Sequence, residues 1–192
     1  IEPPPVMAYY YIWFEERSWN TAKTDYPALG RYRSEDPKVI RQHIQWARES
    51  GIDGFIVSWK STFRLDNALD QLVEIAEEEN FPLWIIYQGL NYDRDPVPVE
   101  QVYNDLKYFL EPCGQREAFA MYDRPVVIWS GTWEFSATDI QLVTANYTDT
   151  LYILASERST EGYERLSHSV DGNAYYWSSV NPDVDKNHAE RL

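Results

Sequence analysis

Aromatic and amide side chains gather at the ends of several short apolar segments of this sequence. The segments are rich in β-branched and aromatic residues and are too short for most helices, so we interpret them as buried strands. At or next to their carboxyl ends stand the residues that we expect to contact a ligand: Tyr11, Trp13, Trp59, Tyr87, Gln88, Trp129 and Trp177. Tyr and Trp rings stack on the apolar face of a pyranose, while phenol, indole and amide groups hydrogen-bond its hydroxyls. The residue types therefore predict a sugar site, although a ring at a strand end fills the core about as often.

Carboxyl groups that could cleave a glycosidic bond are few near these ends. Glycoside hydrolysis ordinarily needs two of them flanking the bond, about 5–5.5 Å apart when one is the nucleophile and wider when water attacks. Glu15 and Glu16 follow the first apolar segment, and Glu134 follows the fourth. Glu157 directly follows the segment 151–156 and is our candidate catalytic residue. Most loop glutamates are solvated surface charges, and this alternative stays open for all four.

The sequence indicates no metal or cofactor site. Cys113 is the one cysteine, so the paired Cys and His ligands of a zinc site are missing. His43, His168 and His188 show no spacing typical of a catalytic triad or a metal site. We therefore expect neither a cofactor nor a metal.

Strands and helices alternate along the chain and must position these residues. We expect strands at 6–14, 54–59, 82–88, 126–130, 151–155 and 172–177. Asp36 and Pro37 begin the first of the intervening helices and Gly51 ends it, while residues 136–139 are typical of a capping box. A weaker helix is expected at 161–170. Strands joined by helical crossovers lie parallel, and their carboxyl ends meet at one edge of the sheet.

The fold class follows from how such a sheet closes. A chain of 192 residues is short for an eight-stranded barrel, which typically uses about 250, and length alone favours an open doubly wound sheet. The bulky residues 13–17 stand where a nucleotide-binding fold needs glycines after its first strand. We therefore predict an α/β fold, a (β/α) barrel of TIM type truncated to about six strands. It forms one domain over 1–192 that is incomplete at its C-terminus, and we expect a missing segment or another chain to complete it.

Three segments carry a resemblance to a known family. Residues 10–14, 27–36 and 51–59 resemble, in order and spacing, the opening of glycoside hydrolase family 99 and its family 71/99-like relatives. Weaker similarity continues at 93–95, 106–109, 124–128 and 170–176. The resemblance implies a (β/α) barrel that cleaves or binds polysaccharide, mannoside-like in the best-known members.

Two departures from that family bear on the chemistry. Members that resemble endo-α-mannosidases carry a His-x-Glu-Pro segment on the third strand, whereas this chain has Tyr87-Gln88-Gly89-Leu90. The subsite built there must differ. The family's paired glutamates, three residues apart on a late strand, would lie beyond Leu192.

Charge excludes several partners. The chain has 31 acidic and 17 basic residues, a formal net charge of −14. Such a protein is a poor partner for nucleic acid or an anionic membrane surface, and no apolar run is long enough to span a bilayer. The first residues, 1–5, lack an initiator Met, so we expect a processed or excised chain. A secreted or extracytoplasmic origin is consistent with this start, but no localisation follows from it.

Two classes of function therefore remain. The first, which we favour, is a glycoside hydrolase that takes part of its catalytic carboxyl groups from a segment beyond residue 192. The alternative is a non-catalytic carbohydrate-binding or scaffold module that keeps the aromatic cleft on a degenerate barrel. Both predict an oligosaccharide or polysaccharide as the partner.

Overall fold

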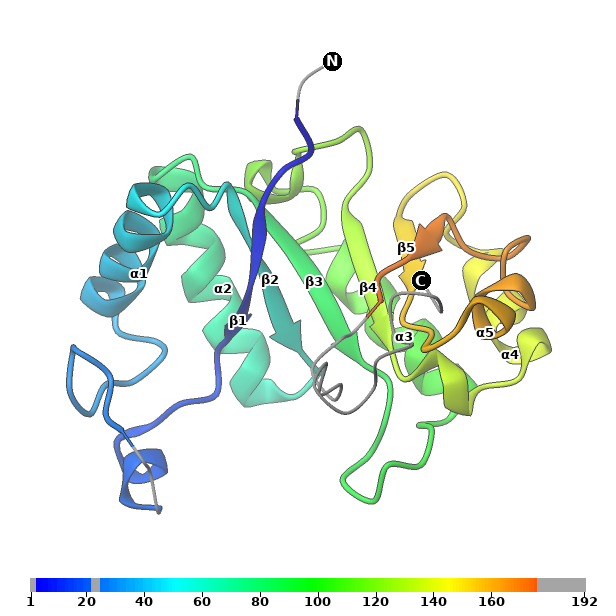
Figure 1. Cartoon of the computed structure of the whole chain (residues 1–192), viewed down its shortest axis with the longest axis horizontal. Helices are drawn as coiled ribbons and strands as arrows, with labels where there is room; N and C mark the ends of the chain where they lie inside the picture. The colour runs from blue at the N-terminus through cyan, green and yellow to red at the C-terminus, as the bar shows by residue number, and fades with distance from the viewer. Residues whose placement is uncertain (1–2, 22–24, 176–192) are drawn as a thin grey trace, which may run out of the picture.

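Six parallel strands lie in sequential order in one sheet (Figure 1). The computed structural model describes residues 3–21 and 25–175. The strands are β1 (Met7–Tyr11), β2 (Gly54–Trp59), β3 (Leu83–Gln88), β4 (Val126–Ser130), β5 (Tyr152–Ala155) and β6 (Gly172–Asn173). Each adjacent pair is parallel. This order confirms the predicted barrel-type topology, because the strand order of a dinucleotide-binding fold reverses around its first strand.

Helices connect the strands, as the alternation predicted. They are η1 (Glu16–Asn20), α1 (Pro37–Glu49), α2 (Phe63–Glu78), α3 (Val99–Leu110), η2 (Glu117–Phe119), η3 (Thr132–Glu134), α4 (Ala137–Thr144) and α5 (Thr160–Glu164). The predicted signals act locally. The Asp36 carboxylate accepts a hydrogen bond from the backbone N–H of Lys38, and Gly51 takes a positive φ of 75° just after α1. Ser136 and Asp139 form the predicted capping box of α4.

Three elements are shorter than the sequence predicted. The last strand, β6, ends at Asn173, and the described residues 174–175 do not continue it. The first strand ends at Tyr11, and Tyr9 and Tyr11 are partly exposed, so this strand is not covered on both faces. The helix expected at 161–170 ends at Glu164 and buries none of its residues. Without an apolar stripe to pack, a helix gains little from continuing beyond the first residues that its N-cap supports.

The sheet has two faces of different character, because successive side chains of a strand point to opposite sides. One face packs on helices, and α2 and α3 lie behind the sheet in Figure 1. Val57, Ile85 and Val127 are fully buried on that face. The opposite face carries a separate, smaller apolar cluster built on Ile56, Ile86 and Ile128. The second face is therefore the one on which a strand-end site can be open.

The sheet does not close on itself within the described residues. There, β1 pairs with β2 alone and β6 pairs with β5 alone.

None of the helices in the described part of the chain combines the length and the apolar character that crossing a membrane requires.

Candidate functional site

Two adjoining pockets open where β1 to β4 end. Their cavity volumes are about 340 and 500 Å³, and both are lined by Trp13, Gln88, Arg94 and Ser130. We call the two pockets together the cleft. Its position at the carboxyl ends of parallel strands is where barrel folds place their functional groups.

The floor of the cleft is polar. Ser58, Gln88 and Ser130 come from the last two positions of three neighbouring strands and line the first pocket together with Ile86. The Gln88 side-chain N–H donates to the Ser58 hydroxyl oxygen at 2.9 Å. This bond orients the amide without using its carbonyl oxygen, which stays able to accept a hydrogen bond. The strand ends therefore present an anchored amide and hydroxyls within one small space.

An aromatic wall stands beside this floor. The rings of Tyr11 and Trp13 have centroids 4.6 Å apart, and the two residues are 37% and 39% exposed. Trp133, from η3, lines the same pocket, and Tyr92 lines the second pocket and is fully exposed. Large rings that stay exposed beside polar groups are suited to stack on a sugar ring while neighbouring groups take its hydroxyls.

Basic side chains also line the cleft. Among the residues that the structure describes, the lining set has no Asp or Glu and includes four cations: Lys60, Arg64, Arg94 and Arg158. No sequence pattern singles them out. Lys60, Arg94 and Arg158 stand in connecting segments without periodicity, Arg64 is the second residue of α2, and the fold alone brings the four together. The described lining of the cleft, in a chain of net charge −14, therefore has a charge opposite to that of the whole molecule.

The structure brings together three of the predicted contact residues, Tyr11, Trp13 and Gln88. The expectation that the others converge there is corrected for Trp59, Tyr87 and Trp129, which are buried on the helix-facing side of the sheet. Alternation is the reason. Adjacent residues of a strand point to opposite faces, so Tyr87 and Gln88 cannot both enter the cleft. Trp177 lies outside the described residues.

The three buried rings tie the strands to the helices. The Trp59 indole N–H donates to the Asp66 carboxylate on α2 at 2.9 Å, and the Tyr87 hydroxyl donates to the Asp105 carboxylate on α3 at 2.8 Å. Burial raises the pKa of the Asp105 carboxyl above its ordinary value and raises the pKa of the Tyr87 hydroxyl as well. Trp129 packs edge-on against Phe135. These contacts make the three rings part of the core.

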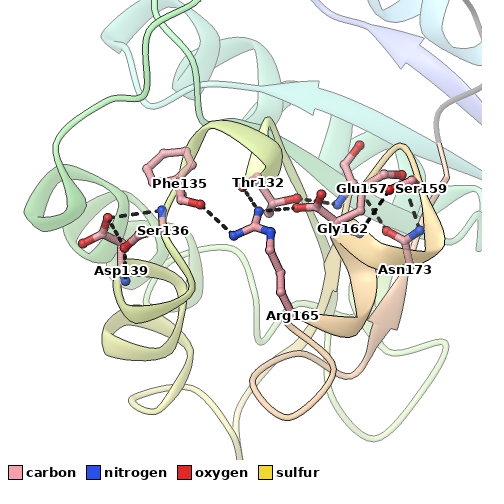
Figure 2. A network of polar contacts seen from close by, with 10 residues as sticks. Thr132, Phe135, Ser136, Asp139, Glu157, Ser159, Gly162, Arg165 and Asn173 are labelled. Atoms are coloured by element: carbon pink, nitrogen blue, oxygen red, sulfur yellow. Dashed lines mark hydrogen bonds and ion pairs between the residues drawn. The ribbon is translucent and has the colours of Figure 1, made fainter.

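Glu157, the candidate catalytic residue, is held in an ion pair (Figure 2). It is only 3% exposed, and the Arg165 guanidinium donates to its carboxylate at 2.8 Å. The same guanidinium donates to the backbone carbonyls of Thr132 and Phe135, at 2.8 and 2.9 Å. The Glu157 backbone N–H in turn donates to the side-chain oxygen of Asn173. Glu157 is not among the lining residues of the cleft, so the expectation that it borders the site is corrected.

Metal ligands do not gather in the described part of the chain. No three His, Cys, Asp or Glu side chains there are placed to hold an ion together. The cleft offers a ligand aromatic, amide, hydroxyl and cationic groups.

Comparison with known proteins shows which folds and sequences this chain is similar to. No model of a known protein family matches the chain. It is 27% identical over 104 residues to a mouse glycoprotein endo-alpha-1,2-mannosidase-like protein and 31% identical over 103 residues to the mouse glycoprotein endo-alpha-1,2-mannosidase. Each match covers 50% of this chain and 22% of the relative. A family 99 endo-alpha-mannosidase of Bacteroides thetaiotaomicron superposes with a TM-score of 0.79 at 17% identity, covering 95% of this chain and 62% of that one.

The chain resembles the family 99 endo-α-mannosidases. The resemblance to these enzymes predicted from the first sixty residues is confirmed, and the solved structures show that their barrel fold is shared. A glycoside hydrolase-like protein superposes as well, with a TM-score of 0.64 at 16% identity, covering 99% of this chain and 66% of that one. The aligned region amounts to about a fifth of the length of the curated mannosidases and to less than two thirds of the B. thetaiotaomicron enzyme in the comparison above.

Proposed function

We propose that the cleft binds an oligosaccharide, and that the chain is the carbohydrate-binding part of a glycoside hydrolase-like protein. The observation that carries the proposal is the pairing of the exposed Tyr11 and Trp13 rings with the anchored Gln88 amide in one pocket. Sugar recognition needs both kinds of group within the width of one ring. The fold shared with the solved endo-alpha-mannosidases supports the same conclusion and favours a mannose-containing ligand.

Binding is better supported than cleavage. Hydrolysis ordinarily needs two carboxyl groups on either side of the bond, and the described lining of the cleft holds none. Glu157 forms an ion pair with Arg165 and lies outside the cleft. Hydrolysis is the second candidate, favoured by the names of the relatives, and it needs carboxyl groups from outside the described residues.

A matched pair of tryptophans tests binding. Trp13 and Trp46 are both 39% exposed, but Trp46 lies on α1 and is not among the lining residues of the cleft. We expect Trp13→Ala to weaken binding of a mannan-derived oligosaccharide by about 1–3 kcal/mol in calorimetric titration, from the stacking area of one ring. Trp46→Ala should bind like the wild type. Equal losses in both variants, or no binding by the wild type, would contradict the proposal.

A second measurement separates binding from hydrolysis. The wild-type chain is incubated with the same oligosaccharide and new reducing ends are counted. We expect binding without release. Release at a rate that Trp13→Ala lowers would favour the hydrolase.

A further inference from the structure

We infer that the ligand of the cleft is an acidic oligosaccharide, one whose rings carry a carboxylate, sulfate or phosphate group. This inference rests on the proposed function and names the class of sugar. The starting observation is the set of four cations in a cleft whose described lining has no carboxylate. A cleft lined by one sign of charge concentrates ions of the other sign.

Two arginines of the cleft differ from most other arginines in the described part of the chain in having no ion pair there. Most arginines outside the cleft meet the abundant carboxylates of this chain: Arg41 pairs with Glu78 and Glu79, and Arg116 pairs with Glu77. Arg31 is an exception and donates to the side-chain oxygen of Asn20. Within the described residues, Arg94 and Arg158 form no ion pair, although both line the first pocket. Two uncompensated guanidinium groups at one pocket of an acidic protein favour an anion between them.

The other two cations, Arg64 and Lys60, already contact oxygen atoms of the protein. Arg64 pairs with Glu15 at 2.7 Å and donates to the backbone carbonyl of Trp13. The Lys60 ammonium donates to the backbone carbonyl of Leu90 at 3.2 Å. These contacts leave Arg94 and Arg158 as the groups most available to an anionic ligand.

The local geometry keeps both guanidinium groups at the cleft. The Arg158 guanidinium carbon lies 3.8 Å from the centroid of the Trp133 ring. Stacking uses the face of the guanidinium and leaves the N–H groups at its edge able to bind a carboxylate or sulfate through two parallel hydrogen bonds. Arg94 has a φ of 71°, unusual for a residue with a side chain, in a turn where the Asn91 side-chain oxygen accepts from the backbone N–H groups of Asp93 and Asp95. The turn therefore holds Arg94 at the boundary of the two pockets.

The test compares neutral and acidic sugars of the same length. Calorimetric titration of the 192-residue chain would use a neutral mannan oligosaccharide, its sulfated and phosphorylated forms, and an oligomannuronate of the same length. We expect at least one acidic sugar to bind about tenfold more tightly than the neutral one. Its affinity should fall between about 50 and 300 mM salt, while that of the neutral sugar stays constant. The three acidic sugars show which anion is preferred.

Charge-matched variants locate the effect. Arg94→Gln and Arg158→Gln should each weaken binding of the acidic sugar by about fivefold or more beyond any loss for the neutral sugar, so that the ratio of the two affinities falls. Lys107→Gln is the control, because Lys107 is exposed on α3, pairs with Glu111 and lies outside the cleft.

Three outcomes would overturn the inference. Equal binding of neutral and acidic sugars would reject the acidic ligand and leave the proposed function standing. Equal loss in Lys107→Gln would assign the preference to net charge instead of to the cleft. No binding of any sugar would reject the proposed function as well.

Discussion

Glu157→Gln distinguishes a structural carboxylate from a catalytic one. Glu157 is buried, and the Arg165 guanidinium that it binds also holds two backbone carbonyls, so one ion pair joins the end of β5, the η3 segment and α5. Removing one partner of a buried pair typically costs about 3–5 kcal/mol. Glutamine keeps one oxygen as an acceptor, and the Arg165 side chain is 33% exposed, so water can solvate the orphaned cation in part. We therefore expect a loss of about 1–3 kcal/mol in the free energy of unfolding.

Urea denaturation of the wild type and the variant measures this loss. For a chain of this length, about 2 kcal/mol corresponds to a fall of roughly 4–8 °C in Tm. Arg165→Gln should cost a comparable amount, and the double variant should cost less than the sum of the two, because both single changes break the same pair. Sugar affinity should stay within about twofold of the wild type in Glu157→Gln, since Glu157 lies outside the cleft.

The opposite pattern would refute this reasoning. Suppose that Glu157→Gln unfolds with the wild-type midpoint but loses about 10²-fold or more in a hydrolysis rate at unchanged sugar affinity. Glu157 would then be an acid or base in catalysis, and the structural role assigned to its ion pair would be wrong.

Two further changes test the core beneath the cleft. Trp59→Ala removes a ring that is 1% exposed and hydrogen-bonded to Asp66, so the free energy of unfolding should fall by about 3–5 kcal/mol in thermal unfolding. A variant of wild-type stability with impaired sugar binding would instead show that Trp59 contacts the sugar. Asp105→Asn tests pH dependence: burial raises the pKa of Asp105 in the folded state, so its contribution to stability is present below the unfolded pKa of about 4 and is lost as the pH rises through the folded pKa. Asparagine can still accept a hydrogen bond from the Tyr87 hydroxyl but does not ionise. The Tm of Asp105→Asn relative to that of the wild type should therefore rise between about pH 4 and pH 7. A Tm difference that does not change with pH would contradict this expectation.

The elements and their order were predictable because their signals are local. The Asp36 cap, the Gly51 stop and the Ser136 capping box each act within a few residues, and helical crossovers allow few strand orders. The ends of the shortest elements were not predictable in this way. The helix that ends at Glu164 has its own N-cap but no buried stripe, and packing decides where such a helix stops.

The site was predictable only in part, because proximity to a strand end does not fix the direction of a side chain. Alternation with the buried Val57, Ile85 and Val127 assigns Trp59, Tyr87 and Trp129 to the core face, and the sequence already contained this signal. No such pattern exists for Arg94 or Arg158, which stand in connecting segments and reach the cleft through the fold.

The indole N–H signals of the tryptophans give the most direct test of the central claim that the cleft is the sugar site. Each tryptophan contributes one indole signal in a ¹⁵N–¹H correlation spectrum, and single substitutions assign them. On titration with the tightest-binding oligosaccharide, we expect the signals of Trp13 and Trp133 to move, while those of Trp59, Trp129 and Trp46 stay in place. Movement confined to Trp46, or unchanged Trp13 and Trp133 signals at a saturating sugar concentration, would contradict it.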